Sequence, residues 1–267
     1  MKRNLLVVGA VAVLAACGIS TQQEVELGQS YSQQINAQLP IVSDPEINRY
    51  INVLGDSIAK LSDERNLDWR FFIVDSREVN AFAVPGGFIY VNRGLIERAQ
   101  NLSMLAGVLG HEIGHVIERH SVQQMQKMQQ AQIGVQLACI LTRVCENQAT
   151  GALINVAGTA VFAKFSRDDE READRDGITF LTRAGIHPGG IPAMFRVLLA
   201  ERNRQSSAVD AWFSTHPLEE ERIAETEGMI KQIDSAILAT LTTDTPYYQE
   251  FRRRVTALPP PPAMPRS

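Results

Sequence analysis

Two histidines and a glutamate stand at metal-site spacing in the stretch Leu102 to His120, which reads LSMLAGVLGHEIGHVIERH. His111 and His115 are four residues apart, so on a helix both imidazoles project from one face and can reach one ion. In an HExxH helix the two histidines hold zinc. The glutamate between them, Glu112, takes a proton from a metal-activated water and carries it to the leaving amine. The spacing therefore predicts peptide hydrolysis without a covalent intermediate.

The residues around the motif favour this interpretation over a chance match. The chain has 5 histidines, and random placement gives on the order of 0.006 matches to HExxH. Gly110 and Gly114 leave room for another element to pack closely. The alternative is a plain helix with solvated or hydrogen-bonded histidines. Against it, the remaining positions predict a buried helix, with apolar residues at Leu102, Leu105, Ala106, Leu109, Ile113 and Val116.

A zinc site also needs a third protein ligand and an open position for water. The metzincin pattern HExxHxxGxxH fails here, because Glu118 replaces its glycine and Ser121 its last histidine. A cysteine ligand upstream of the motif is also disfavoured, since Cys139 and Cys145 lie downstream. A carboxylate from a second helix remains.

The segment Phe165 to Gly177, FSRDDEREADRDG, offers such carboxylates. Glu170 and Asp174 are four residues apart on one helix face. One can therefore bind zinc while the other accepts the spare N–H of a zinc-bound imidazole. Ala173 beside them permits close helix packing, whereas Glu172 points roughly 160° away from Asp174. The alternative for this segment is a solvated, charged turn of helix.

The first residues have the layout of a secretory signal. Two basic residues precede an apolar run from Leu5 to Ala16 that is too short to span a bilayer. The sequence LAACG at its end resembles the lipobox of bacterial lipoproteins. This resemblance implies removal of residues 1–16, acylation of Cys17 by groups such as palmitate, and, from Gly18, sorting to the outer membrane. We expect an anchor that faces the periplasm; an incidental cysteine after an ordinary signal is the alternative.

Composition and charge are those of an ordinary globular protein. Hydrophobic residues make up 45% and charged residues 21% of the chain, and the mature length suits one or at most two domains. The net charge is -4, and lysines and arginines are dispersed among acids, so we expect no nucleic-acid partner. In an oxidising periplasm Cys139 and Cys145 could form a disulfide.

The remaining patterns predict an α+β, mainly helical fold with a small sheet or hairpin beside the HExxH helix. Residues 17–43 should form the lipidated N-terminus and an amphipathic linker helix, from Thr21 to Gln38. Residues 44–245 should form the catalytic domain, with Asp44 capping its first helix. The Pro-rich tail, residues 246–267, should be disordered.

Strands are predicted at Trp69 to Asp75, and on both sides of a turn at Pro85-Gly86-Gly87. An endopeptidase that binds an unfolded segment usually needs an exposed sheet edge, where main-chain hydrogen bonds hold the substrate extended. A plain structural hairpin is equally compatible with the sequence. The candidate substrate edge is the start of the hairpin: Asn80, Ala81, Phe82 and Ala83.

Three histidines lie outside the motif. His120 is nine residues from His111, about 180° around a continuous helix, and should be on the surface. His187 precedes Pro188-Gly189-Gly190 and belongs to a turn. His216 precedes Pro217, where a histidine is usually a loop or cap residue.

Four motifs of this chain occur in the same order as in a known family. They are the hairpin NAFAVPGG, HExxH, the pattern ExxxD from Glu170 to Asp174, and Thr215-His216-Pro217. The family that the chain resembles is the gluzincin metallopeptidase family of CAAX prenyl endopeptidases and HtpX, and the chain is most similar to periplasmic lipoprotein members such as LoiP. The resemblance covers roughly residues 44–231.

The resemblance implies one zinc ion held by His111, His115 and Glu170, with Glu112 as the base. It further implies that Asp174 supports a ligand and that Arg222 is nearby. His216 should approach the metal, either stabilising the oxyanion or blocking the water site in a resting form.

We therefore expect a zinc-dependent endopeptidase of the cell envelope that cleaves unfolded or misassembled proteins, with possible links to envelope assembly machinery. The alternative is a periplasmic chaperone or assembly factor that holds clients on the edge strand and has a latent or structural zinc site. Glu112 argues against the alternative, because a structural site needs no general base.

Overall fold

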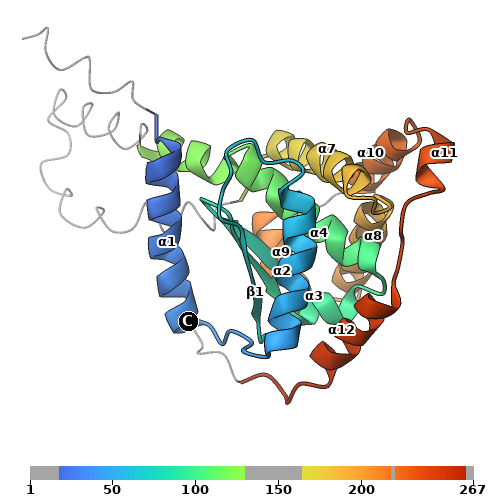
Figure 1. The fold of residues 1–267 in the computed structure, drawn as a ribbon, viewed down its shortest axis with the longest axis horizontal. Helices are drawn as coiled ribbons and strands as arrows, with labels where there is room; N and C mark the ends of the chain where they lie inside the picture. Colours follow the sequence, from blue (N-terminus) through green and yellow to red (C-terminus); the bar gives the residue numbers. More distant parts are fainter. Residues whose placement is uncertain (1–17, 130–163, 218–219, 263–267) are drawn as a thin grey trace, which may run out of the picture.

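The computed structural model describes residues 18–129, 164–217 and 220–262. Helices surround a small three-stranded sheet, which confirms the predicted fold class (Figure 1). Residues 120–129 are also helical. The signal peptide, Cys17, Cys139 and Cys145 lie outside the described residues. The other helices are α1 (Thr21–Gln38), α2 (Pro45–Ala59), α3 (Arg93–Arg98), α4 (Leu102–Ile117), α7 (Arg167–Arg183), α8 (Gly190–Asn203), α9 (Asp210–Thr215), α10 (Glu220–Ile230), α11 (Ser235–Leu238) and α12 (Pro246–Thr256), with a 3-10 turn at Ser207–Val209.

The sheet has the strand order β1-β3-β2. Strands β2 (Ala81–Val84) and β3 (Phe88–Asn92) form the predicted antiparallel hairpin. Gly86, with φ of 81°, occupies a turn conformation that residues with a side chain rarely adopt. Strand β1 (Arg70–Val74) pairs in parallel with β3. Sequence patterns did not predict this non-local pairing.

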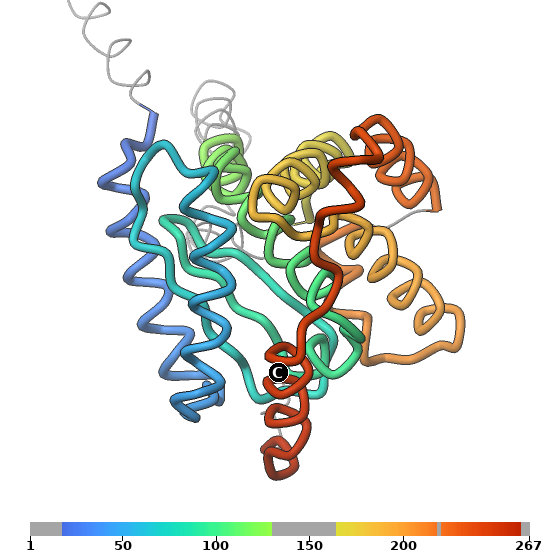
Figure 2. Tube along the Cα trace, turned by 45° about the vertical axis from the view of Figure 1, so that its right-hand side comes forward, coloured from blue at the N-terminus to red at the C-terminus, as the bar shows by residue number. Residues whose placement is uncertain are grey.

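The two faces of the sheet contact different layers. Successive side chains of a strand point to opposite faces. Ile89 of β3 accordingly joins the main core with α2 and α4, while Tyr90 joins a smaller cluster with α1. The Tyr90 hydroxyl lies 2.9 Å from the Ser32 hydroxyl and 3.0 Å from Oδ1 of Asn36. Helix α1 therefore packs against the sheet (Figure 2).

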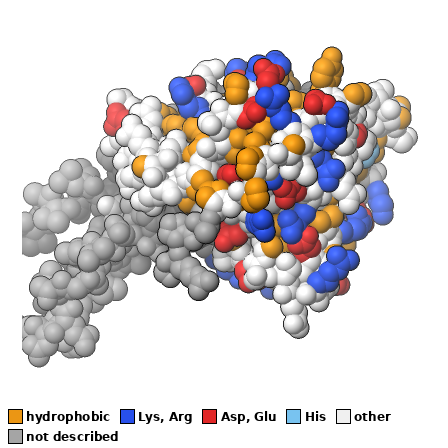
Figure 3. Space-filling model, turned by 90° about the horizontal axis from the view of Figure 1, so that it is seen from below, with side chains coloured by type: hydrophobic (Ala, Val, Ile, Leu, Met, Phe, Trp, Pro, Cys, Tyr) orange, Lys and Arg blue, Asp and Glu red, His pale blue; other side chains and the backbone are white. Residues whose placement is uncertain are grey.

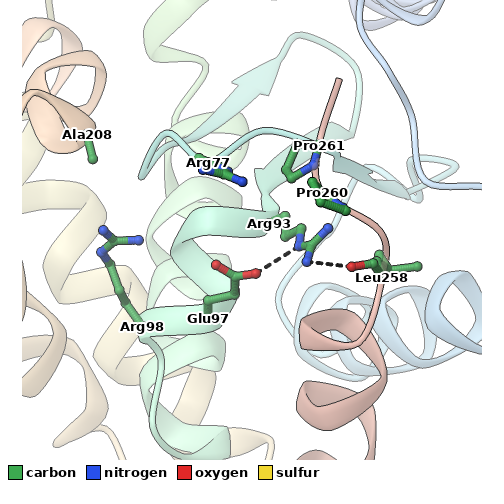
Figure 4. A pocket seen from close by; sticks show the side chains of 8 residues that line it. All are labelled: Arg77, Arg93, Glu97, Arg98, Ala208, Leu258, Pro260 and Pro261. Atoms are coloured by element: carbon green, nitrogen blue, oxygen red, sulfur yellow. Dashed lines mark hydrogen bonds and ion pairs between the residues drawn. The ribbon is translucent and has the colours of Figure 1, made fainter. Parts of the chain in front are cut away.

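Residues 246–256 form helix α12, where the sequence predicted a disordered tail. The correction has a physical cause: Tyr248, Phe251 and Val255 recur at helical spacing and are buried. Beyond the helix, Arg93 donates hydrogen bonds to the carbonyls of Leu258 and Pro259 and holds the start of the Pro-rich segment against the domain (Figure 4).

The described surface carries mixed charge. On the face seen in Figure 3, basic and acidic side chains are interspersed with apolar ones. Within the described ranges, each helix is too short or too polar to cross a bilayer.

The most extensive helix contact in the core is between α4 and α7. Helix α4 begins after Asn101, whose side chain accepts a hydrogen bond from the backbone N–H of Met104. A Cβ atom at Gly114 would lie 3.0 Å from Cα of Ala173, and one at Gly110 would lie 3.3 Å from Cα of Gly177. The absence of side chains thus lets the two helix backbones approach, as the sequence predicted.

We predict that Gly114→Ala lowers the free energy of unfolding by about 1–3 kcal/mol, because overpacking against the α7 backbone outweighs the better helix propensity of alanine. The matched control is Gly228→Ala in α10, where a Cβ atom would meet no atom within 4 Å. That change should raise stability by about 0.5–1 kcal/mol. Denaturant unfolding of both variants measures the difference, and equal stability would contradict the packing argument.

Candidate metal and active site

Helices α4 and α7 bring His111, His115 and Glu170 together in the core, and all three side chains are buried. The Nε2 atoms of the two histidines are 3.1 Å apart. Oε2 of Glu170 lies 3.6 Å from Nε2 of His111, and Oε1 lies 3.5 Å from Nε2 of His115. Three potential ligand atoms from two helices therefore converge on one point.

His216 adds a fourth donor. Because the helical conformation is disfavoured before proline, Pro217 favours the end of α9 at this residue, and His216 is extended with φ of -113° and ψ of 97°. Its ring stacks on Trp212, with centroids 4.6 Å apart. Nδ1 of His216 lies 3.4 Å from Nε2 of His111 and 3.0 Å from Oε1 of Glu170.

These four residues fit a metal ion. Their donor atoms all lie within 4.8 Å of one another. Ligands about 2.0–2.1 Å from a tetrahedral zinc are roughly 3.3 Å apart, which is close to the separations given above. Three imidazoles and a carboxylate are also the donor types that zinc accepts.

Arg222 on α10 bridges the two buried carboxylates of α7. Its guanidinium makes two hydrogen bonds to Asp174, of 2.8 and 2.7 Å, and another to Glu170. Oδ1 of Asp174 in turn lies 2.9 Å from Nδ1 of His111. Because a carboxylate can only accept, Nδ1 of His111 carries the proton of this hydrogen bond. The lone pair of Nε2 is then free and faces the other potential metal ligands. The arginine balances the charge of both buried carboxylates.

The protonation states of two ligand candidates suit metal binding. Burial lowers the pKa of His115 well below its usual range, so this imidazole is neutral. Burial alone would raise the pKa of Glu170, but His216, His115 and Arg222 outweigh it and keep the carboxylate charged. A neutral imidazole and a carboxylate are the forms that coordinate metals.

Glu112 is buried beside this group, and apart from the backbone N–H of Ala83, which faces it, neither of its carboxylate oxygens has a hydrogen-bond donor. Its Oε1 lies 3.6 Å from Nε2 of His216. Burial raises the pKa of Glu112, although electrostatic attraction to His216 and His111 and the backbone N–H of Ala83 lower it. Burying a carboxylate with so few hydrogen bonds costs stability, and groups of this kind cluster at functional sites.

Strand β2, the candidate substrate edge, lies at the edge of the sheet, and the amide of Ala83 faces Glu112. Ala81, Phe82 and Ala83 are nevertheless buried, with at most 8% of each residue exposed, and Asn80 is half-buried. The position fits the expectation, but the exposed edge that a substrate strand needs is absent from this conformation of the described residues.

His120 is buried, which corrects the expectation that it lies on the surface. That expectation assumed a continuous helix. Instead α4 ends at Ile117, and Arg119 has the left-handed φ of 59°, so the chain turns before residues 120–129 resume a helix. Nδ1 of His120 lies 2.9 Å from Nδ1 of His115. Sequence reasoning also did not assign Phe165, which stacks on His115 with centroids 4.0 Å apart; its position just before α7 was the only available signal.

An HExxH helix beside a small sheet, with a glutamate from a second helix facing both histidines, defines a zincin-like metallopeptidase domain. The family described as peptidase family M48 matches residues 45–230. The chain therefore belongs to peptidase family M48, which confirms the resemblance found in its motifs.

Curated relatives agree with this assignment. The chain is 33% identical over 226 residues to the beta-barrel assembly-enhancing protease of Escherichia coli, covering 82% of this chain and 46% of that protein. It is 34% identical over 146 residues to metalloprotease YcaL of Escherichia coli, covering 54% and 56%. It is also 28% identical over 183 residues to the mitochondrial metalloendopeptidase OMA1 of Schizosaccharomyces pombe, covering 68% and 53%. The chain spans about half the length of these relatives.

We predict that Asp174→Asn weakens zinc binding about 10–100-fold, because the hydrogen-bond acceptor of His111 loses its charge and Arg222 loses an ion pair. Competition with a chelating dye measures the affinity of the metal-free protein. Asp168→Asn is the matched control, since Asp168 is on the same helix and its side chain is 96% exposed. Equal affinities for the two variants would show that Asp174 does not support the site.

Proposed function

We propose that this chain is a zinc-dependent endopeptidase of the cell envelope that cleaves unfolded or misassembled proteins. One observation carries the proposal. Four buried donor atoms converge beside Glu112, a buried carboxylate that accepts no hydrogen bond from a side chain. Membership of a peptidase family and the names of the relatives, which include proteases and metalloendopeptidases, support the same activity.

His111, His115 and Glu170 would hold the zinc, with His216 as a fourth donor. When bound, the ion would supply Lewis acidity to water and to the substrate carbonyl. Asp174 keeps His111 in the tautomer whose Nε2 faces the ion, and Arg222 fixes Asp174 and Glu170. These residues thus set the position of the ligands before substrate binds.

Glu112 is the general base and then the general acid. It takes a proton from the attacking water and passes it to the leaving nitrogen as the peptide bond breaks. Its burial supports this role, because a raised pKa makes the carboxylate a stronger base nearer to neutral pH.

His216 blocks the site in this conformation. Its Nδ1 atom is within 3.4 Å of His111 and Glu170, so it occupies the fourth ligand position, which a catalytic zinc site keeps for water. The buried β2 strand is consistent with the same resting form. Movement of His216 away from His111 and Glu170 would free the water position.

The lipobox-like sequence that ends at Cys17 and Gly18 supports a location on the periplasmic side of the outer membrane. Acyl groups on Cys17 would anchor the protein in that membrane. The beta-barrel assembly-enhancing protease is named for an assembly process. By analogy, we propose misassembled envelope proteins as substrates and envelope assembly machinery as a partner.

A second candidate is a chaperone or assembly factor with a structural zinc. A closed set of four protein donors favours it, because structural zinc sites have no open position. The buried carboxylate of Glu112 argues against it, since a structural site has no use for a base.

We predict that Glu112→Gln binds zinc with unchanged affinity but cleaves an unfolded protein about 10²–10⁴-fold more slowly, because the amide cannot accept the proton of water. Metal content and the cleavage of casein are measured on the purified protein. Equal cleavage by wild type and variant would reject the mechanism. A zinc-loaded wild type that prevents aggregation of a client without cutting it would favour the chaperone.

We predict that His216→Ala cleaves casein several-fold faster than wild type, because it opens the side of the site that the imidazole fills. Thr215→Ala, one residue earlier, is the matched control. A rate that falls about 10²-fold or more would instead assign His216 to stabilisation of the oxyanion. Glu112→Gln in the His216→Ala background should abolish the gain.

A further inference from the structure

His120 lies behind the metal-site histidines, at the beginning of the helical residues 120–129. The turn at Glu118 and Arg119 directs its side chain back toward α4. Arg119 is anchored there by a hydrogen bond of 2.7 Å from Nε to Oε2 of Glu24, a buried carboxylate on α1. The imidazole of His120 is 1% exposed, so each of its nitrogens needs a protein partner.

Both nitrogens of His120 have such a partner. Nδ1 lies 2.9 Å from Nδ1 of His115, and Nε2 lies 3.2 Å from Oε2 of Glu172 on α7. A second carboxylate oxygen, Oδ1 of Asp169, lies 3.8 Å from the same Nε2. His120 therefore stands between a metal-ligand candidate and the charged surface of α7.

When Nε2 of His115 binds a metal, the hydrogen-bond chemistry of this row allows one consistent arrangement. A carboxylate only accepts, so Nε2 of His120 carries a proton and donates it to Glu172. The neutral imidazole then has a lone pair at Nδ1, which can accept a hydrogen bond from Nδ1–H of His115. With its proton on Nδ1, His115 presents the lone pair of Nε2 to Glu170 and His111, where a metal would bind.

We propose that His120, held by Glu172, is the positioning residue that keeps His115 in its metal-binding tautomer and orientation. It does for His115 what Asp174 does for His111, with a neutral imidazole in place of a carboxylate. Phe165, stacked on His115, fixes the plane of the ring, and the hydrogen bond from His115 to His120 fixes its rotation in that plane. The inference rests on the proposed metal site.

The test uses two substitutions that separate hydrogen bonding from packing. His120→Leu fills the space but offers no acceptor, so we expect zinc affinity to fall about 10–100-fold. His120→Asn places Oδ1 near the position of the original Nδ1, so affinity should stay within about threefold of wild type. Chelator competition gives the affinity, and thermal unfolding of the metal-free proteins reports packing separately. His187→Leu, which removes a histidine that accepts from the backbone N–H of Gly189, is the control.

A second measurement reads the tautomers directly and needs no metal. The chain has 5 histidines, so their ring nitrogens can be assigned by long-range ¹H–¹⁵N NMR of the full protein. In metal-free wild type we expect His115 to be protonated at Nδ1 and His120 at Nε2. In His120→Leu, His115 should lose its preference for the Nδ1–H form.

Three outcomes would overturn the proposal. These are wild-type zinc affinity in His120→Leu, an equal loss in His120→Asn and His120→Leu, or a proton on Nδ1 of His120. A wild-type protein that binds no zinc would reject the metal site itself, and this role with it. By contrast, if wild type binds zinc and the His120 variants bind it equally well, only the role of His120 is rejected.

Discussion

The site depends on how closely α4 and α7 approach. Gly110 faces Gly177 and Gly114 faces Ala173, so the two backbones meet with almost no side chain between them. Glu170 is one turn before Asp174 on α7, and His111 is one turn before His115 on α4. Close approach therefore brings a short carboxylate side chain to imidazoles on the neighbouring helix. A larger residue at the contact would separate the ligand sets by more than these side chains can span.

Burial of so many charged groups needs compensation. Glu170 and Asp174 are both nearly inaccessible to solvent, and their charges are balanced by Arg222, whose guanidinium is itself buried and touches both. Such networks are unfavourable when one member is missing. Glu112 is the exception, because it is buried without a hydrogen bond from any side chain. Glu170, Asp174 and Arg222 thus stabilise the site, whereas Glu112 is available to accept and release a proton.

Much of this could be predicted from the sequence because the relevant signals are local. The HExxH spacing, the i and i+4 carboxylates, and the hairpin glycines each act within one or two turns of chain, and the structure places them where those patterns indicate. Non-local features were not predictable in the same way. The parallel pairing of β1 with β3 skips a strand, and α12 was overlooked because the adjacent prolines dominated the composition.

His120 shows why a helical wheel fails at a helix end. A wheel extends the 3.6-residue period through every residue, but one left-handed residue, Arg119, changes the direction of the chain. Nothing in the sequence marks that residue, because arginine rarely adopts this conformation. What stabilises it is a contact from 95 residues away in the chain, the buried carboxylate of Glu24. The side of the metal site next to His115 is thus determined by α1, a helix that contributes none of the four donor atoms and that follows directly on the expected lipid anchor.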